Sequence, residues 1–160
     1  MNSAHAVGFA PFYDAESKVL ILGSFPSVKS RETSFYYGHP QNRFWKTVCS
    51  FFGEQTAQTV EEKKEFLLRR KIALWDVVIE CDIVGSSDAS ICNPVAADVE
   101  GLVKTLPLRK ILCNGKTAYT LLLRYAPALK GLATLLPSTS PANPRFIKEP
   151  WQEALAEVFS

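Results

Sequence analysis

A polar segment rich in aromatic residues, in the first third of the chain, is the first candidate for chemistry. It runs from Gly23 to Trp45 and contains GSFPS at 23–27 and SFYYGHPQNRFW at 34–45. The imidazole of His39 is a candidate general acid, and the amide of Asn42 can donate and accept hydrogen bonds. Aromatic rings beside such a loop either sandwich a flat base or plug the top of a sheet. The four rings are Phe25, Phe35, Tyr36 and Tyr37.

A second polar loop lies near the end of the chain. Positions 136–146 read LPSTSPANPRF, a stretch with three prolines, several hydroxyls and one amide. A rigid loop with short hydrogen-bonding groups suits contact with phosphates while an apolar edge enters a groove. A plain connector between a strand and the last helix would have a similar composition.

The distribution of cysteine and histidine argues against a metal centre. The four cysteines are spread along the chain without a CxxC pair, and His5 and His39 are the two histidines. This pattern matches neither a zinc site nor an iron–sulfur cluster. We therefore expect reduced, mostly buried thiols, no metal and no cofactor.

The apolar pattern predicts the elements that must position these loops. Short β-rich runs predict buried strands at 19–23, 72–79, 110–113 and 132–136. Amphipathic or charged patterns predict helices at 41–52, 60–71, 94–106, 116–125 and 151–159. Alternating strands and helices favour an α/β sandwich with a mainly parallel sheet. Ligands of such sheets bind beyond the carboxyl ends of the strands, so we expect the site in the loops after Gly23, Val78, Cys113 and Leu136.

Length and composition limit the remaining possibilities. With 160 residues, 47% hydrophobic and 21% charged, the chain predicts a single domain over residues 1–160 that folds on its own. A net charge of +2 and a pI near 8.3 are compatible with a phosphate-bearing partner. They fall short of the pI above about 9 that is typical of strongly basic binding domains. Because no targeting segment or membrane-length apolar run is seen, we expect a cytoplasmic protein without membrane contact. We also expect a monomer.

Taken together, the two loops resemble the motif regions of the uracil-DNA glycosylase superfamily. Residues 19–45, with Gly-x-x-Pro and then His39-Pro-x-Asn42-Arg-Phe-Trp45, are similar to the first motif region of its mismatch-specific branch. The stretch 136–144 is similar to the second, and SPANP at 140–144 resembles the single-strand-selective members. With NGKTA at 114–118, the likeness covers nearly the whole chain. It implies a three-layer α/β/α sandwich with a short, mainly parallel four-stranded sheet, and a monofunctional DNA glycosylase of base excision repair.

Two departures from the superfamily pattern narrow the resemblance. Members usually carry Asp or Asn between the Gly and the Pro of the first motif, where this chain has Phe25. They carry His or Asn near the start of the second motif, where this chain has Ser138. GSFPS together with HPQN instead resembles the hypoxanthine-DNA glycosylase branch, whose catalytic amide corresponds to Asn42. The resemblance therefore implies DNA with a deaminated base as the partner, hypoxanthine first, with uracil or xanthine also possible.

The same resemblance implies roles for individual residues. Asn42 is the predicted catalytic amide, and His39 is a second catalytic candidate with a structural loop histidine as its alternative. Tyr37 corresponds to the aromatic residue that stacks on the flipped base. The other predicted base-binding residues are Gly23, Ser24, Phe25, Pro26 and Tyr36. The predicted DNA-binding residues are Ser27, Lys29, Lys116, Ser138, Thr139, Ser140, Pro141, Ala142 and Asn143.

Other hypotheses stay open from the sequence alone. Asp76 and Asp82 are candidate carboxylates near the end of the second predicted strand. A nucleosidase or deoxyribosyltransferase acting on free nucleosides would cleave the same N-glycosidic bond without needing to bind DNA. A non-catalytic binder of damaged DNA would be compatible with the missing Asp or Asn of the first motif.

Overall fold

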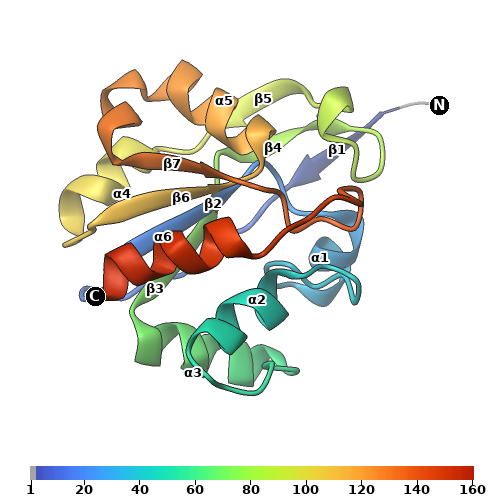
Figure 1. The fold of residues 1–160 in the computed structure, drawn as a ribbon. Helices are drawn as coiled ribbons and strands as arrows, with labels where there is room; N and C mark the ends of the chain where they lie inside the picture. The colour runs from blue at the N-terminus through green and yellow to red at the C-terminus, as the bar shows by residue number, and fades with distance from the viewer. Residues whose placement is uncertain (1–2) are drawn as a thin grey trace.

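A four-stranded parallel sheet forms the centre of the computed structural model, which describes residues 3–160 (Figure 1). The strand order is β3-β2-β6-β7, and every neighbouring pair is parallel. The strands are β2 (Val19–Gly23), β3 (Ile72–Asp76), β6 (Lys110–Asn114) and β7 (Ala133–Leu136). All four carboxyl ends therefore meet at one edge of the sheet.

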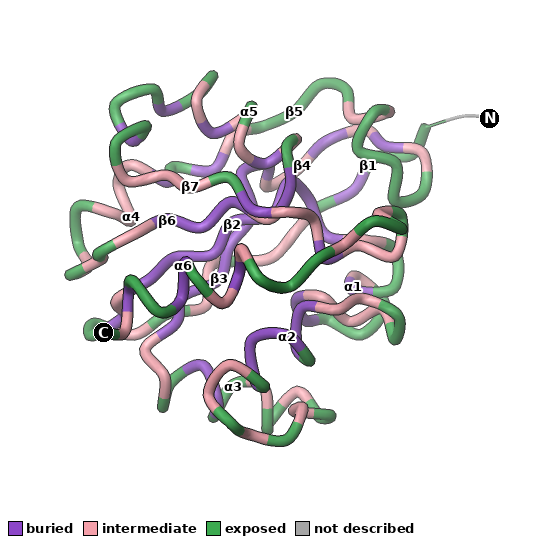
Figure 2. The backbone as a smooth tube through the Cα atoms, viewed as in Figure 1, coloured by how far each residue is buried: buried purple, intermediate pink, exposed green. Residues whose placement is uncertain are grey.

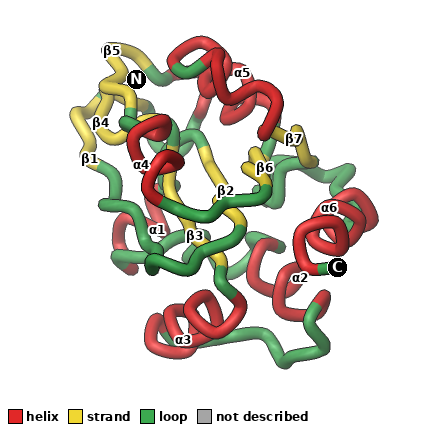
Figure 3. The backbone as a smooth tube through the Cα atoms, turned by 90° about the vertical axis from the view of Figure 1, so that its left-hand side faces the viewer, coloured by secondary structure: helices red, strands yellow, loops and turns green. Residues whose placement is uncertain are grey.

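Helices cover both faces of this sheet and complete the predicted three layers (Figure 3). One face carries α2 (Phe44–Phe51), α3 (Val60–Arg70) and α6 (Glu149–Phe159). The other carries α4 (Val99–Thr105) and α5 (Lys116–Tyr125). The predicted α/β/α sandwich is confirmed. None of the helices within residues 3–160 is both long enough and apolar enough to cross a bilayer.

Burial on both faces explains why the central strands are continuous apolar runs (Figure 2). In β2, Val19 and Ile21 join the core beneath α2, α3 and α6, whereas Leu20 and Leu22 join the core beneath α4 and α5. All four side chains are fully buried. Successive residues of a strand point to opposite faces, so an inner strand of a parallel sheet needs apolar residues at every position.

A second, antiparallel sheet was not predicted from the sequence. Its strands, in the order β1-β4-β5, are β1 (Ala4–Val7), β4 (Val78–Ile83) and β5 (Cys92–Ala96). The apolar run at 72–79, predicted as one strand, belongs to both sheets: β3 ends at Asp76 and β4 begins at Val78. The prediction of a loop after Val78 was therefore wrong, and the functional edge of the sheet lies at Asp76.

The predicted helix at 94–106 begins later than expected. Pro94 lies in β5, which is an edge strand of the second sheet, and there the missing N–H of proline is tolerated. The helix α4 starts at Val99, after Asp98, whose side chain accepts a hydrogen bond from the N–H of Gly101 at 3.0 Å. The start of α4 is therefore marked by the Asp98 cap and not by Pro94.

Three short helical segments complete the chain. Helix α1 (Val28–Thr33) follows the first loop and is capped by Ser27, whose Oγ accepts from the N–H of Ser30. The two 3-10 helices are η1 (Asp88–Ser90) and η2 (Pro127–Leu132). Because η2 ends at Leu132, the strand predicted at 132–136 begins one residue later, at Ala133.

Candidate active site

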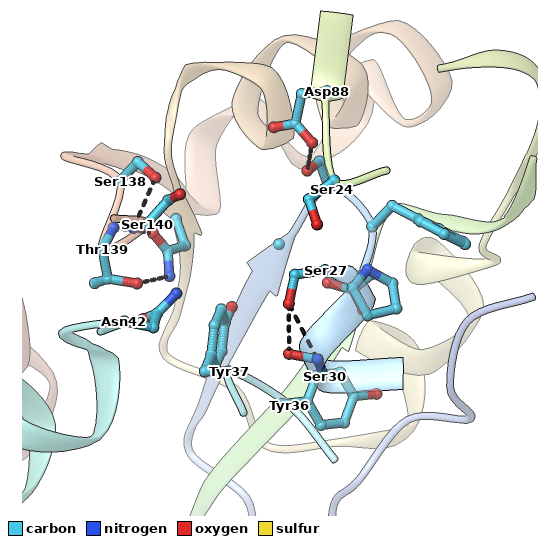
Figure 4. A pocket seen from close by; sticks show the side chains of 16 residues that line it. Ser24, Ser27, Ser30, Tyr36, Tyr37, Asn42, Asp88, Ser138, Thr139 and Ser140 are labelled. Carbon is cyan, nitrogen blue, oxygen red and sulfur yellow. Dashed lines mark hydrogen bonds between the residues drawn. The ribbon is translucent and has the colours of Figure 1, made fainter. Parts of the chain in front are cut away.

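A cavity of about 120 Å³ opens at the carboxyl end of the parallel sheet (Figure 4). It is smaller than the roughly 300–1,000 Å³ pockets that hold drug-sized ligands, and it suits a single small ring system. Both polar loops of the sequence contribute to its wall. The lining residues are Gly23, Ser24, Phe25, Pro26, Ser27, Ser30, Tyr36, Tyr37, Asn42, Asp76, Ser86, Asp88, Asn114, Ser138, Thr139 and Ser140.

One part of the cavity wall is formed where β2 and β3 end side by side. Gly23 and Asp76 are register partners in the two parallel strands. A Cβ atom on Gly23 would lie 2.5 Å from Oδ1 of Asp76 and 3.3 Å from the hydroxyl oxygen of Tyr37. Position 23 must therefore be glycine for this carboxyl group and this phenol to come together beside the strand end.

Two polar atoms at this point have no hydrogen-bond partner among residues 3–160. They are Oδ2 of Asp76 and the hydroxyl oxygen of Tyr37, and both are buried. A buried polar group left unpaired costs about 1–3 kcal/mol, so such groups are unusual in a folded protein. A polar ligand in the cavity would supply the missing partners.

Burial also determines which protonation states these two groups adopt. It raises the pKa of Asp76 from its ordinary value of 3.8 to about 8, with a further contribution from the negative charge of Asp88. Burial likewise raises the pKa of the Tyr37 hydroxyl above its ordinary value of 10.0. Near neutral pH both groups are therefore protonated, and each offers an O–H donor.

The predicted stacking residue, Tyr37, has an unusual backbone conformation. Its φ angle is +54°, in the left-handed region that a tyrosine seldom adopts. Its ring stacks on Phe44 of α2, with centroids 4.1 Å apart and an interplanar angle of 22°. The neighbouring Tyr36 is buried, and its hydroxyl donates to the carbonyl of Ala10 at 2.8 Å. Packing against α2 thus holds Tyr37 in the cavity wall.

Asn42, the predicted catalytic amide, lies just before α2 and lines the cavity. Its Oδ1 accepts a hydrogen bond from the N–H of Phe44 at 2.9 Å, as in an Asx turn that leads into the helix. The oxygen of the amide is therefore engaged by the helix. The NH2 group is the part of Asn42 left to donate to a ligand (Figure 4).

His39 lies in a neighbouring cavity and does not line the first one. Its Nδ1 accepts a hydrogen bond from the N–H of Gln41 at 3.0 Å, so one ring nitrogen shapes the turn before α2. Tyr37 and Asn42 line both cavities. Of the two residues predicted as catalytic, the structure thus brings Asn42, and not His39, to the base-sized cavity.

Hydrogen bonds attach the loop at 138–143 to the end of β6 and to the start of α2. The side-chain amide of Asn114, at the end of β6, accepts from the N–H of Thr139 and donates to its Oγ1, both at 2.9 Å. The guanidinium of Arg43 donates to the carbonyls of Ser140 at 3.1 Å and Asn143 at 2.9 Å. Thr139 is fully buried, so its side chain fastens the loop from inside.

The other residues of this loop hold its shape and form its outer edge. Oγ of Ser138 accepts from the N–H of Ser140, and Oγ of Ser140 accepts from the N–H of Ala142. The Asn143 amide donates to the Ser138 carbonyl at 2.9 Å. Ala142 is exposed and Pro141 is half-buried. Lys116, at the start of α5, lines a shallow surface cavity together with Ser138 and Asn143, so it lies beside this edge.

The residues of the first loop divide between cavity, core and surface. The Ser24 hydroxyl donates to Oδ1 of Asp88 at 2.8 Å. Phe25 packs on Val78 and Cys81 in a small core of its own, so an apolar side chain occupies the position where the superfamily usually has a polar one. Pro26 is buried in the cavity wall, whereas Lys29 is exposed on α1.

Sequence reasoning missed several residues of the site. Asp88 was not singled out, because nothing in the spacing shows that the connection after β4 returns to the end of β2. The fastening roles of Asn114 and Arg43 were also missed, although both belong to the motifs quoted above. Of the two carboxylates considered, Asp76 lies in the cavity, and Asp82 lies on the second sheet, paired with His5 and Asn93.

The cysteines and acidic residues form no metal centre in the part of the chain that the structure describes. Cys49, Cys81 and Cys113 are buried and Cys92 is exposed, and each is a free thiol. The polar groups of the cavity are hydroxyls, amides and two carboxyls. These groups can donate and accept hydrogen bonds.

The raised pKa of Asp76 predicts a dependence of stability on pH. The folded state holds the proton up to about pH 8, whereas an unfolded Asp releases it near 3.8. The contribution is therefore fully present below pH 3.8, is lost as the pH rises toward about 8, and is constant above that value. Thermal melts of Asp76→Asn should show a smaller decrease in Tm between about pH 5 and about pH 8 than melts of the parent. Equal decreases in Tm would show that Asp76 is not protonated in the folded protein.

Comparisons with known proteins agree with this fold. The profile of the Uracil DNA glycosylase superfamily matches residues 10–157. A protein named hypoxanthine DNA glycosylase from Methanosarcina acetivorans is 38% identical over 146 residues, which cover 88% of this chain and 90% of the relative. A protein of the same name from Methanosarcina barkeri is 35% identical over 155 residues, covering 92% and 96%.

A solved structure is similar over almost the full length. The solution NMR structure of a candidate uracil DNA glycosylase from Methanosarcina acetivorans superposes with a TM-score of 0.82 at 34% sequence identity. The match covers 98% of this chain and 100% of that one. These findings confirm the predicted family resemblance and the prediction of a DNA glycosylase. The chain belongs to the uracil DNA glycosylase superfamily.

Proposed function

We propose that this DNA glycosylase removes hypoxanthine from DNA in base excision repair, with uracil or xanthine as weaker substrates. The observation that carries the proposal is the base-sized cavity whose wall presents donors without partners, the Asp76 carboxyl and the Tyr37 hydroxyl. Names of relatives add support, because both Methanosarcina proteins are called hypoxanthine DNA glycosylases. Hypoxanthine has a carbonyl where adenine has an amine, so it offers an acceptor to these donors. Adenine would place its own donors against them.

The DNA must deliver the base to this cavity by flipping it out of the stack. Flipping costs a few kcal/mol and costs least at a mispaired base, which deamination produces. Under the proposal, the rigid loop at 138–143 grips the flanking phosphates, and its outer edge at Pro141 and Ala142 fills the vacated space. The fastening of this loop by Arg43 and Asn114 supports that role, since a preorganised loop loses less entropy on binding.

Bond cleavage then depends on stabilising the charges that separate. The bond between the sugar C1′ and the base nitrogen breaks, its electron pair goes to the base, and the sugar becomes oxocarbenium-like. The NH2 of Asn42 donates to the departing base, because its oxygen is engaged by Phe44. The amino end of α2, which begins two residues after Asn42, adds a positive partial charge on the same side. Tyr37, held by Phe44 on one face, stacks on the base with the other.

The proposal also covers the domain organisation, the oligomeric state, the location and the role of His39. The chain acts as one glycosylase domain over residues 1–160, which the family match at 10–157 supports. It acts as a monomer in the cytoplasm. It needs no metal or cofactor, because the cavity supplies donors for the leaving base. His39 contributes through the shape of the turn that carries Asn42, which its hydrogen bond with Gln41 supports.

Base release from duplexes that carry single lesions tests the proposal. Hypoxanthine, uracil and xanthine duplexes are incubated with excess protein and treated with alkali, which cleaves the strand at an abasic site. We expect the fastest cleavage with hypoxanthine and no hydrolysis of free deoxyinosine. Hydrolysis of the free nucleoside at a similar rate would favour a nucleosidase. Tight binding without cleavage of any of the three duplexes would favour a non-catalytic binder.

The role of Asn42 is tested by replacing its NH2 group alone. Asn42→Asp keeps an oxygen that accepts from the N–H of Phe44, so the melting temperature should stay close to that of the parent. Loss of a preorganised donor should slow single-turnover base release by about 10²–10³-fold, or about 2.7–4 kcal/mol. Gln41→Asp is the matched control, because it adds the same charge at the adjacent exposed position. Equal rates for the two variants would remove Asn42 from the mechanism.

A further inference from the structure

A second carboxyl group, that of Asp88, lies at the same cavity and has no role in the mechanism so far. It begins η1, in the connection between β4 and β5, far in sequence from both polar loops. In Figure 4, Asp88 and Ser24 lie on one side of the cavity, and Tyr37 and Asn42 lie on the other. The departing base and the sugar would therefore lie between Asn42 and Asp88.

The side chain of Asp88 is turned toward the cavity although the residue itself is exposed. Its Oδ1 accepts a hydrogen bond from the Ser24 hydroxyl at 2.8 Å. Among residues 3–160, no Lys, Arg or His forms an ion pair with Asp88, so its charge is not neutralised there. The carboxylate can therefore act on positive charge or on water in the cavity.

The two carboxyl groups of the cavity have different environments. Asp76 is almost fully buried and unpaired, and its pKa of about 8 keeps it protonated near neutral pH. Burial also raises the pKa of Asp88, but the hydrogen bond from Ser24 opposes that rise, and the negative charge of Asp88 helps to keep Asp76 neutral. Two carboxyl groups separated in this way by their environments are typical of an acid and base pair.

The position that usually carries the carboxylate or amide of the first motif cannot supply one here. Phe25 occupies it and packs into the small core with Val78 and Cys81. The connection after β4 brings Asp88 to Ser24, the residue immediately before Phe25. A carboxylate is thus present at this end of β2, but it comes from a different part of the chain.

We propose that Asp88 is a catalytic residue that stabilises the oxocarbenium-like sugar and activates the attacking water. This inference rests on the proposed function. As the C1′–N bond breaks, its electron pair goes to the base, which takes up a proton from solvent or from the Asp76 carboxyl. The water oxygen forms the new bond to C1′, and its proton passes to Asp88. Exchange with solvent restores both carboxyl groups, so the net reaction adds one water molecule across the bond.

If Asp88 only held the connection between β4 and β5 in place, its replacement would disturb that connection. The catalytic and the structural role can be separated, because other contacts also hold this connection. Two other contacts hold the connection at 85–86: the N–H of Val28 donates to Oγ of Ser86 at 2.9 Å, and Arg31 donates to the carbonyl of Gly85 at 2.9 Å. Asp88→Asn also keeps an oxygen to accept from Ser24. The variant should therefore fold with the loop in place and lack only the charge and the basic oxygen.

The test compares single-turnover release of hypoxanthine by the parent, Asp88→Asn and Asp82→Asn. Asp82 is the matched control, because it undergoes the same change on the second sheet, outside the cavity. We expect Asp88→Asn to be slower by about 10²-fold or more, in line with the contribution of a general base. Its affinity for DNA should be equal or higher, since one negative charge is removed. Asp82→Asn should match the parent.

The pH profile adds a readout that a structural role would not change. The charged and titratable groups around Asp88 are Asp76 and Tyr37 across the cavity, Cys81 on β4, and Arg31 on α1. The Arg31 guanidinium donates to the carbonyls of Pro26 and Gly85. The parent rate should fall at acid pH as Asp88 takes up a proton, and Asp88→Asn should lack that fall.

A rate for Asp88→Asn within about threefold of the parent, or an unchanged fall at acid pH, overturns the inference while the proposed function stands. A parent that releases no hypoxanthine overturns the proposed function and this inference with it.

Discussion

The close approach of β2 and β3 at their carboxyl ends is the constraint on which the site depends. Parallel register places Gly23 beside Asp76, and the absence of a side chain at position 23 leaves room for the Tyr37 hydroxyl. The result is a pair of buried polar groups without partners, which the rest of the fold must stabilise. Apolar packing on both faces of the sheet provides that stability, and the polar pair becomes available to a ligand.

One helix links this packing to the chemistry. The buried face of α2 packs on the sheet and on α6, and Phe44 in that face supports the Tyr37 ring. The residues that precede the helix carry the functional groups: Asn42 accepts from the first N–H of α2, and Arg43 reaches to the loop at 138–143. The cavity wall and the DNA-facing loop are therefore positioned by the same element, so a change in the packing of α2 would disturb base binding and DNA binding together.

The sequence predicted the parallel sheet and its helices, because two-sided burial is a local pattern, and Asn42 was identified through the resemblance of the HPQN segment. It did not predict the antiparallel sheet, since the apolar run at 72–79 gives no sign that the chain leaves one sheet at Asp76 and enters another at Val78. Asp88 was missed for a related reason: its contact with Ser24 joins residues 64 positions apart. The protonation state of Asp76 could not be predicted either. Its raised pKa comes from burial in the folded protein, which residue spacing does not reveal.

The central claim is that the cavity at the sheet edge receives the flipped base. A crystal structure with a duplex containing 2′-fluoro-deoxyinosine, whose glycosidic bond resists cleavage, tests it most directly. The account predicts the hypoxanthine ring inside the cavity, with its carbonyl oxygen hydrogen-bonded to a donor of the Asp76 and Tyr37 pair, and the loop at 138–143 against the vacated stack. Hypoxanthine still stacked in the duplex, or bound on another face of the protein, would contradict it.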